Sequence, residues 1–584
     1  MTRCRGHGGG GRRPPVGKTG WRVGRTGRQS EPMTNGDAQA QRTNAGIEDG
    51  PGEGRAGAVG SGWRWWAAWL AVLGLALALR APRLGERPMH ADESVHAIKF
   101  IGLLEEGRYA YDPNEFHGPT LYYFTLPIAW LAGEKTGAEL REATLRLTPL
   151  IFGLAVIALL PVAVGGRGRG ASLAAGAWLA VSPVWAYYSR YFIHEMILVA
   201  ATWWWLVCLW RLWRTGRWRW AAAAGLGLGL MHATKETFVF NVAAAAGAAA
   251  VAWLWQRRRR PEWFSGRRAA GLGVVMAGVA LVVSVTFFSS FFTHEGGWWQ
   301  GPLDSVRTYA AWGARAKGES PHIHPWWFYL ERLFWWRRPE GPLFTELAVG
   351  LLALVGLAAA VRGRLPAGVN AGWARFLALY TLLLAGMYTV IAYKTPWLVL
   401  VWYHGMVLLA GLGTVVLWRS GRRWWARGLA AAVFGAVGLH LAAQSCRAAF
   451  TYAAEPQNPW VYAHTSRDLL RLVKRVQGVA RHHPHPEAMV VKVIAPGGDY
   501  WPLPWYLRTL PHVGYYAAVP EDPFADVVIA GSRIAPPLDD LSDKKWIMAG
   551  YYKLRPRVFL ALYPRFDLWK AYVEAEPPTD DEEE

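Results

Sequence analysis

Long apolar runs that alternate with short arginine clusters constrain the fold of this chain more than any other feature. A helix that crosses a lipid bilayer needs about 20 apolar residues. Segment 119–133 is shorter and has an internal proline, so we interpret it as a juxtamembrane or re-entrant helix. The pattern predicts an α-helical polytopic membrane protein with about 11 transmembrane helices. The candidate spans are 62–82, 143–165, 171–188, 192–212, 218–232, 237–256, 269–292, 343–361, 373–392, 398–417 and 427–446.

The composition agrees with a membrane protein and excludes other classes. Hydrophobic residues make up 52% of the 584 residues and charged residues only 18%, which is too apolar for an ordinary soluble enzyme. The formal net charge of +21 comes from arginines between the apolar runs rather than from one soluble basic face, so we expect no nucleic-acid partner. Cys4, Cys208 and Cys446 are the three cysteines, and they predict neither a disulfide framework nor a cysteine metal site.

The basic loops set the predicted orientation in the membrane. If the basic N-terminal tail is cytoplasmic, every short basic loop is cytoplasmic too, as the positive-inside rule requires. Counting 119–133 as a full span would move all the later basic loops outside. We therefore predict a multi-pass protein of the cell (plasma) membrane with a cytoplasmic N-terminus. The basic loops contain Arg167 and Arg169, Arg211 to Arg219, Arg257 to Arg268, Arg362 and Arg364, and Arg419 to Arg427.

The first two predicted regions are a tail and a membrane domain. Residues 1–61 are rich in glycine and arginine and offer little to bury, so we predict a disordered cytoplasmic tail, within which Met33 is an alternative start. Residues 62–446 are predicted to form the membrane domain. Its long outer loops are 83–142 and 293–341.

The third region, residues 447–584, has no apolar run long enough to cross a membrane. A helical pattern at 463–481 is followed by apolar or β-like runs at 488–495, 525–530 and 546–563. Alternation of helix and strand predicts a small α/β domain. The orientation above places this domain, with its acidic tail, outside the cytoplasm.

Polar residues on the predicted outer face suggest the chemistry. Asp92 and Glu93 are adjacent just past the first apolar run, and Arg146, Arg190 and Glu195 lie at outer ends of spans. An enzyme outside the cytoplasm has no nucleotide pool, and no phosphate-binding glycine loop is evident after a strand, so an activated sugar would arrive as a lipid phosphate. Its transfer needs a carboxylate base, which Asp92 or Glu93 supplies. Cations must stabilise the leaving phosphate, and Arg146 and Arg190 supply these.

Structural roles explain each of these residues when it is taken alone. An arginine at a span end commonly extends toward the lipid headgroups, and Glu195 can simply pair with Arg190. Their grouping at span ends on one face favours a functional site. Lys235 and Lys394 fall on the same face and are further candidates for binding the donor phosphate.

The sequence leaves metal dependence open. Asp92, Glu93 and Glu195 carry the oxygen ligands that Mg²⁺ or Mn²⁺ prefers. Carboxylates at a sugar site serve equally well as hydrogen-bond acceptors. We therefore predict no definite cofactor and keep a divalent cation as the open alternative.

Seven short motifs occur in order along the chain. The first four resemble motifs of the GT-C superfamily of glycosyltransferases that use polyprenyl-phosphate sugars, and are most similar to its protein mannosyltransferase-like branch. The last three resemble a prokaryotic subgroup of flippase-activity-associated proteins. The motifs are Asp92-Glu93 with His96, His117-Gly-Pro119-Thr-Leu121, Leu145-Arg146-Leu147-Thr-Pro149, Ser189-Arg190-Tyr191-Phe-Ile-His-Glu195, Tyr393-Lys394-Thr395-Pro396-Trp397, Asn458-Pro-Trp-Val-Tyr-Ala-His464 and Asp499-Tyr-Trp-Pro-Leu-Pro-Trp-Tyr-Leu-Arg508.

The resemblance implies a GT-C fold with an extracytoplasmic C-terminal domain. It implies that Asp92 occupies the catalytic base position, Glu93 the acidic position beside it, and Glu195 the second acidic position. Arg146 and Arg190 match basic positions near the donor phosphate.

Two histidine positions depart from the family pattern. The family's His-Pro-Pro-Leu is replaced here by His117-Gly118-Pro119-Thr120-Leu121. His96 lies one residue further from the paired carboxylates than the family pattern has it. Both histidines are candidate site residues whose roles stay open.

The sequence thus predicts a membrane glycosyltransferase that moves a sugar from a polyprenyl-phosphate carrier to an extracytoplasmic glycan, lipid or protein. The alternative is a non-catalytic accessory of lipid-linked sugar flipping. Retention of both outer acidic positions and both arginines favours the enzyme. An ion-coupled transporter would have charged residues within its spans and inverted repeats, and the sequence shows neither clearly.

Overall fold

The computed structural model describes residues 59–114, 117–164, 168–255, 260–294, 296–315, 322–538 and 545–576. The chain divides into two units, Met1–Gly60 and Ser61–Glu584. The predicted tail up to residue 58 and the acidic tail Asp580 to Glu584 lie outside the described residues.

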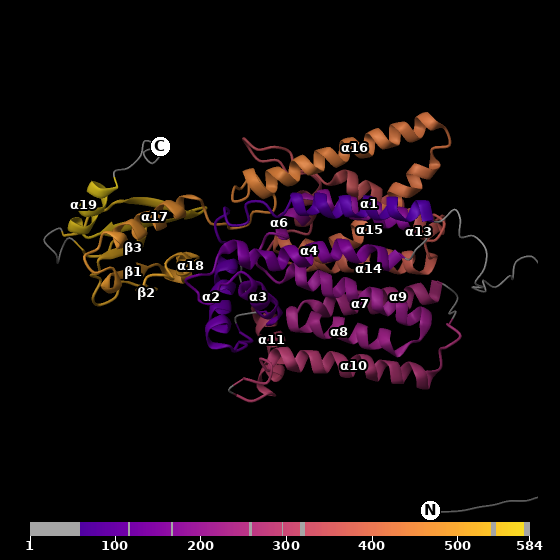
Figure 1. Cartoon of the computed structure of the whole chain (residues 1–584), viewed down its shortest axis with the longest axis horizontal. Helices are drawn as coiled ribbons and strands as arrows, with labels where there is room; N and C mark the ends of the chain where they lie inside the picture. Colours follow the sequence, from indigo (N-terminus) through magenta and orange to yellow (C-terminus); the bar gives the residue numbers. More distant parts are fainter. Residues whose placement is uncertain are drawn as a thin grey trace, which may run out of the picture. The chain divides into compact units, whose positions relative to one another are not determined.

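Most of the second unit is a bundle of apolar helices whose long members run side by side (Figure 1). Seven helical segments of the described residues are long and apolar enough to cross a membrane. Four further predicted spans form the helices α1, α5 with α6, α8 and α13. The polytopic helical architecture is therefore confirmed, while the number of eleven crossings stays a prediction. The seven segments are Glu142–Val162, Glu195–Thr215, Phe238–Trp255, Gly266–Phe288, Ala371–Val390, Pro396–Ser420 and Trp424–Thr451.

The helices of this bundle follow the predicted apolar runs closely. Their bounds are α1 Val59–Ala78, α2 Ala91–Glu106, α3 Thr120–Leu131, α4 Glu142–Val164, α5 Arg169–Val181, α6 Pro183–Tyr188, α7 Glu195–Thr215, α8 Trp218–Thr234, α9 Phe238–Trp255, α10 Gly266–Phe288, α11 Gln300–Arg315, α12 Phe328–Phe334, α13 Leu347–Arg362, α14 Ala371–Val390, η1 Pro396–Val399, α15 Leu400–Ser420, α16 Trp424–Cys446 and η2 Arg447–Thr451. With 12 residues, α3 is shorter than the about 20 residues that a crossing needs.

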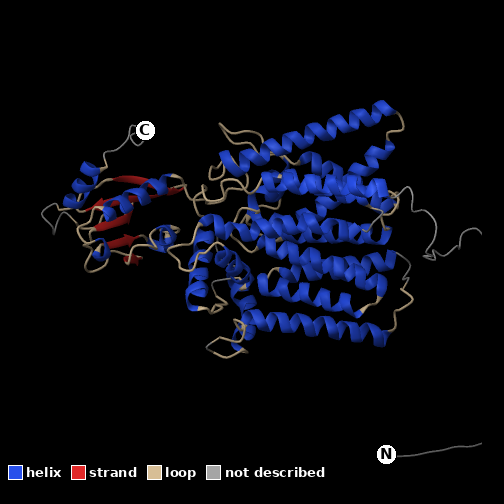
Figure 2. Cartoon of the chain, viewed as in Figure 1, coloured by secondary structure: helices blue, strands red, loops and turns tan. Residues whose placement is uncertain are grey.

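The segment after the bundle is an α/β domain, as predicted (Figure 2). Its five-stranded sheet has the order β2-β1-β3-β5-β4, with β1 parallel to β2 and β3, and β5 antiparallel to β3 and β4. The apolar face of α17 covers the sheet through buried residues at helical spacing, including Leu469, Leu472 and Val476. The elements are α17 Asp468–Arg481, η3 Pro486–Ala488, β1 Val490–Ile494, η4 Pro496–Gly498, α18 Leu503–Tyr506, β2 His512–Tyr516, β3 Val527–Gly531, β4 Gly550–Arg555, β5 Val558–Pro564 and α19 Phe566–Ala575.

Residues of α18 and its flank bind the first residue of α4 and the segments that lead into α2 and α4. The Trp505 indole donates to the Glu142 carboxylate (2.8 Å), and the backbone N–H of Met89 donates to the Tyr506 hydroxyl (2.8 Å). The Arg508 guanidinium donates to two backbone carbonyls just before α4, at 2.7 and 2.6 Å. These hydrogen bonds connect the α/β domain to the start of α2, where the candidate site begins.

Candidate functional site

The paired acidic residues lie in the first turn of α2, where the helix dipole favours negative charge. His90 is the N-cap, and its ring accepts a hydrogen bond from the Asp92 backbone N–H (3.1 Å). The Glu93 carboxylate accepts from the His90 backbone N–H (3.1 Å), which completes a capping box. Because successive helical residues point about 100° apart, Asp92 and Glu93 reach different surroundings.

Glu93 is fully buried and surrounded by donors. The Arg146 guanidinium contacts both carboxylate oxygens, at 2.9 and 3.0 Å, and Arg87 donates at 2.8 Å. The backbone N–H of Phe192 adds another hydrogen bond of 2.9 Å. Burial alone would raise the pKa of the Glu93 carboxyl, but the charges of Arg146 and Arg87 outweigh it and hold the pKa well below its usual range. Glu93 is therefore an ionised carboxylate whose oxygens are already bound.

Asp92 is the accessible carboxylate of the three predicted acidic site residues. Its side chain is 46% exposed, compared with 0% for Glu93 and 2% for Glu195. Among the residues that the structure describes, the ring of His90 is the one basic group within 4 Å of this carboxylate, with 3.8 Å between Nδ1 and Oδ2. Because Nδ1 accepts the Asp92 backbone N–H, it has no proton to donate to the carboxylate. Asp92 is thus fixed at its backbone by the helix start and open at its carboxylate, which suits a group that accepts a proton from a bound molecule.

The two arginines predicted to bind phosphate both contact the segment before α2. Besides Glu93, Arg146 donates to the backbone carbonyls of three residues in the segment before α2. Arg190 likewise donates to three backbone carbonyls, and its guanidinium lies 4.8 Å from the centre of the Phe450 ring. Both arginines therefore hold the segment between α1 and α2. The carbonyls belong to Leu84, Arg87 and Pro88 for Arg146, and to Arg80, Pro82 and Arg83 for Arg190.

Glu195 pairs with Lys235 rather than with Arg190. The Lys235 amino group lies 2.5 Å from the Glu195 carboxylate, and both side chains are buried. Burial alone would lower the pKa of Lys235, but the carboxylates of Glu195 and Glu236 raise it, so this lysine stays charged. The pair joins the start of α7 to the end of α8.

Three histidines cluster near this ion pair, and one of them, His96, belongs to α2. The His194 ring centre lies 4.8 Å from that of His96 and 5.3 Å from that of His117. The ring of His117 contacts the Glu236 carboxylate at 2.9 Å. Burial and the nearby His117 lower the pKa of His96 to about 3, against the smaller opposing effect of Asp92. The structure therefore brings both predicted histidines together with Lys235, and adds His194.

A second group of polar residues lies near Asp92. The Tyr462 hydroxyl contacts the ring of His322 at 2.9 Å, and its backbone carbonyl contacts the ring of His90 at 3.0 Å. Burial lowers the pKa of His322, and the carboxylate of Asp92 opposes this effect. Lys394, which is buried beside these residues, donates from its amino group to the His324 carbonyl at 3.3 Å. Burial lowers the pKa of Lys394.

The predicted carboxylates do not form a metal-binding set. Both oxygens of Glu93 are bound by arginines, and Glu195 is paired with Lys235. Across the described ranges, no group of three or more His, Cys, Asp or Glu side chains is placed to hold a metal ion. The donor set present here therefore does not match a divalent cation.

Sequence reasoning missed the residues that position Asp92. Arg87 binds Glu93 and lies over the Tyr191 ring, with 4.3 Å from the guanidinium carbon to the ring centre. His90 caps α2 and contacts Tyr462. The sequence signal that could have identified them is that Arg87 and His90 come shortly before the adjacent carboxylates Asp92 and Glu93. A carboxylate that becomes buried needs cationic or N–H partners.

A family model and several solved structures resemble this chain. The family described as dolichyl-phosphate-mannose-protein mannosyltransferase matches residues 125–288. No curated protein matches the sequence. The sequence comparison therefore matches one segment of the chain, whereas the structural comparison covers most of it.

The structural similarity covers most of the chain. ArnT from Cupriavidus metallidurans in the apo state is 16% identical with a TM-score of 0.55, over 85% of this chain and 98% of that one. The same protein bound to undecaprenyl phosphate is 14% identical with a TM-score of 0.56, over 86% and 98%. The oligosaccharyltransferase of Archaeoglobus fulgidus, tethered to an acceptor peptide, is 10% identical with a TM-score of 0.53, over 88% and 78%. At these identities the similarity establishes a shared fold.

Proposed function

We propose that this chain, a member of the GT-C superfamily of polyprenyl-phosphate-sugar glycosyltransferases, moves a sugar from a polyprenyl-phosphate carrier to an extracytoplasmic acceptor. The observation that carries the proposal is the open carboxylate of Asp92, held at a rigid helix start among buried cations. The description of the matched family, which names dolichyl-phosphate-mannose, and the undecaprenyl phosphate bound to a similar structure both support a lipid-phosphate donor.

In the proposed reaction Asp92 is the general base. It accepts the proton of the acceptor's nucleophilic group while that group forms a bond to the anomeric carbon of the sugar. The bond between the anomeric carbon and the phosphate oxygen breaks, and the polyprenyl phosphate leaves with the electron pair. A base that is held within hydrogen-bond reach contributes about 10²- to 10⁴-fold to such a step.

We assign Glu93 a positioning role, since its oxygens are bound to Arg146, Arg87 and two backbone N–H groups. A carboxylate in that environment cannot approach an acceptor without leaving two cations buried and unpaired. Its contribution is to keep Asp92 in place.

We assign the donor phosphate to Lys235 and Lys394 ahead of Arg146 and Arg190. The two lysines have fewer partners, since the Lys235 ammonium pairs with one carboxylate and the Lys394 ammonium donates to two backbone carbonyls. The two arginines bind backbone carbonyls of the segment before α2. A lysine ammonium can turn toward an incoming phosphate more readily than a guanidinium fixed by several acceptors.

We further propose the plasma membrane as the location, with the N-terminal tail cytoplasmic and residues 447–584 outside. The arginine distribution between the helices supports this orientation. The acceptor belongs to the class of extracytoplasmic glycans, lipids or proteins. No step of the reaction is assigned to a divalent cation.

The direct test is sugar transfer by the purified full-length chain in detergent or nanodiscs. Radiolabelled polyprenyl-phosphate mannose is the first donor to test, because the matched family is described by that kind of donor. The proposal expects release of polyprenyl phosphate with label appearing in an acceptor from the cell envelope. A non-catalytic accessory of sugar flipping would bind the donor and turn over none of it, which would overturn the proposal.

Lys235 can be tested in the same assay. A phosphate contact acts in both the bound and the transition state, so Lys235→Ala is expected to raise the KM for the donor as well as lower kcat. The matched control is Lys135→Ala, which changes an exposed lysine in the loop after α3. An unchanged KM for the Lys235 variant would remove this residue as a phosphate ligand.

A further inference from the structure

A large cavity lies at the end of the helix bundle opposite to Asp92. It has a volume of about 940 Å³ and is lined by residues of α7, α9, α10 and α14 and by Arg260, Pro261, Trp263 and Phe264. The volume is within the range of about 300–1,000 Å³ that is typical of ligand sites. An alanine-rich face of α9 creates this space opposite the tryptophans of α7. The residues that form these two walls include Ala246, Ala249 and Ala250 on α9 and Trp205, Trp210 and Trp213 on α7.

The charged side chains that line this cavity have one sign. Arg214 and Arg260 are the charged residues of its lining, and no described acidic residue lines it. Neither arginine forms an ion pair within the described part of the chain, and Arg260 lies over the Phe264 ring at 5.1 Å. An apolar space with two cations at its wall is complementary to a ligand that has an apolar chain and an anionic group.

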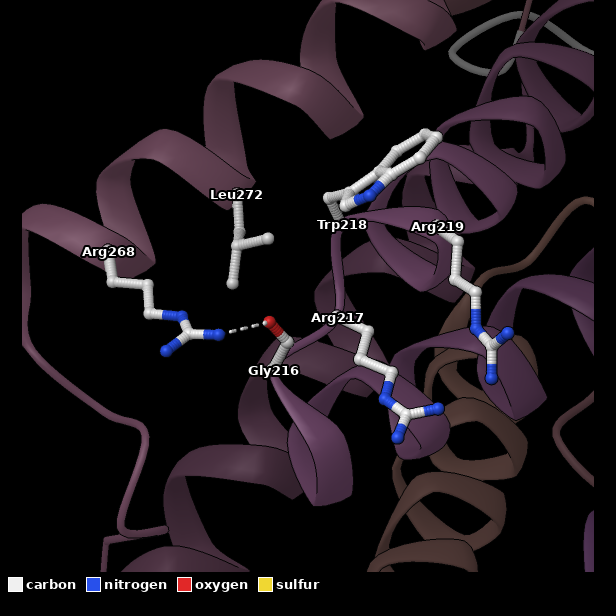
Figure 3. Close-up of a pocket in the computed structure, with 6 residues that line it drawn as sticks. All are labelled: Gly216, Arg217, Trp218, Arg219, Arg268 and Leu272. Atoms are coloured by element: carbon white, nitrogen blue, oxygen red, sulfur yellow. Dashed lines mark hydrogen bonds between the residues drawn. The ribbon is translucent and has the colours of Figure 1, made fainter.

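A second, shallower pocket of about 430 Å³ adds more cations at the same end of the bundle (Figure 3). Trp263 joins the two regions, since it lines the large cavity, donates to the Trp213 carbonyl (2.9 Å) and packs against Gly216. Arg268 donates to the Gly216 carbonyl at 3.3 Å, which fixes the start of α10 beside the α7–α8 turn. The pocket is lined by Gly216, Arg217, Trp218, Arg219, Arg268 and Leu272.

We propose that the cavity of about 940 Å³ is a specific binding site for an anionic phospholipid, with an acyl chain between α7 and α9 and the phosphate at Arg214 and Arg260. The site is separate from the transferase site. Arg214 lies 19 residues along α7 from Glu195, which corresponds to about 28 Å of helix. A phosphate held at Arg214 therefore lies in the opposite leaflet from Asp92, and in the proposed orientation this is the cytoplasmic leaflet.

Lipid retention by the purified full-length chain tests the proposal. Native mass spectrometry would compare phosphatidylglycerol with phosphatidylcholine of the same acyl chains. Two arginines that each strengthen binding about fivefold predict a preference of about 25-fold for phosphatidylglycerol. The double change Arg214→Ala with Arg260→Ala should abolish most of this preference. Arg364→Ala, which removes an exposed arginine after α13, is the control and should retain it.

A cavity-filling variant tests the apolar part of the site. Ala249→Phe places a ring in the cavity and should reduce retention of phosphatidylglycerol, whereas Ala243→Phe, at an exposed position of α9 outside the lining, should not. The arginine double variant leaves the packing intact, so it decides the question if Ala249→Phe fails to fold. Equal retention of both lipids by the wild type, or an unchanged preference for phosphatidylglycerol in the arginine double variant, would overturn the proposal.

Discussion

Glu93 and Arg146 form a fully buried, bidentate ion pair, with 2.9 Å from Nε to Oε1 and 3.0 Å from Nη2 to Oε2. Arg146 also binds backbone carbonyls of the segment before α2. The pair therefore connects α4 to the first turn of α2. Asp92 precedes Glu93 in that turn, so its position depends on this ion pair.

Loss of the Glu93 charge is expected to destabilise the protein. Glu93→Gln keeps the size of the side chain but leaves Arg146 and Arg87 buried without a counter-charge, which costs about 3–5 kcal/mol. The measurement is the thermal unfolding of the purified protein in detergent. Glu106→Gln, at the exposed end of α2, is the control and should change the unfolding temperature little. An unchanged unfolding temperature for Glu93→Gln together with lost transfer would assign Glu93 a direct catalytic role instead.

Acid is expected to destabilise the fold because the buried imidazole of His96 is neutral in the folded protein. The pKa of His96 is about 3 in the folded protein, below its ordinary value of 6.5. Between these values the unfolded chain binds a proton that the folded protein does not, so stability falls as the pH falls below 6.5. At pH 5 this amounts to about 2 kcal/mol for His96. The unfolding temperature should therefore fall between pH 7 and pH 5, and His96→Gln should reduce that fall. An equal fall in the variant would contradict the neutral, buried state of His96.

The fold was largely predictable because hydrophobic length and arginine placement act locally along the chain. The membrane helices, the short helix α3 and the α/β domain all follow from such patterns. The family model that matches residues 125–288 and the shared fold support the resemblance to polyprenyl-phosphate-sugar glycosyltransferases, whereas the flippase-activity-associated subgroup stays a prediction. The number of crossings depends on helix tilt and on the position of the membrane, which local patterns do not determine.

The site was predictable only in part, because burial is a tertiary property. The sequence identifies Asp92, Glu93, Arg146 and Arg190 as outer-face groups with different roles but does not show which of them are buried. The structure separates them, since Asp92 is open while the other three bind one another or backbone carbonyls. The partner of Glu195 was also not predictable from sequence, because Lys235 is 40 residues away.

The anchoring of the α/β domain can be tested at Arg508. Its guanidinium donates to two backbone carbonyls before α4 and lies 3.7 Å from the centre of the Trp505 ring. Arg508→Ala leaves these buried acceptors unpaired, at a cost of about 1–3 kcal/mol. Limited proteolysis should then cleave the chain faster between the bundle and α17. Arg481→Ala removes an exposed ion pair with Glu576 within the domain and should not change the rate. Equal cleavage rates for both variants would contradict the anchoring role.

The proposed orientation predicts the side of the membrane on which the C-terminus lies. An alkaline phosphatase reporter fused after residue 584 should be active, because that enzyme needs an extracytoplasmic location. A fluorescent reporter that matures only in the cytoplasm should stay dark at the same position. The reverse pattern would contradict the orientation and would place Asp92 on the cytoplasmic side.

The central claim is that Asp92 is the base of a sugar transfer, and the rate of transfer by Asp92→Asn tests it most directly. The asparagine keeps the shape and much of the hydrogen bonding of Asp92, and the exposed side chain contributes little to stability, so the variant should fold and bind donor normally. With a purified polyprenyl-phosphate sugar, the account predicts a rate about 10²- to 10⁴-fold below that of the wild type, with Glu106→Gln as the unaffected control. Equal rates for wild type and Asp92→Asn would contradict it.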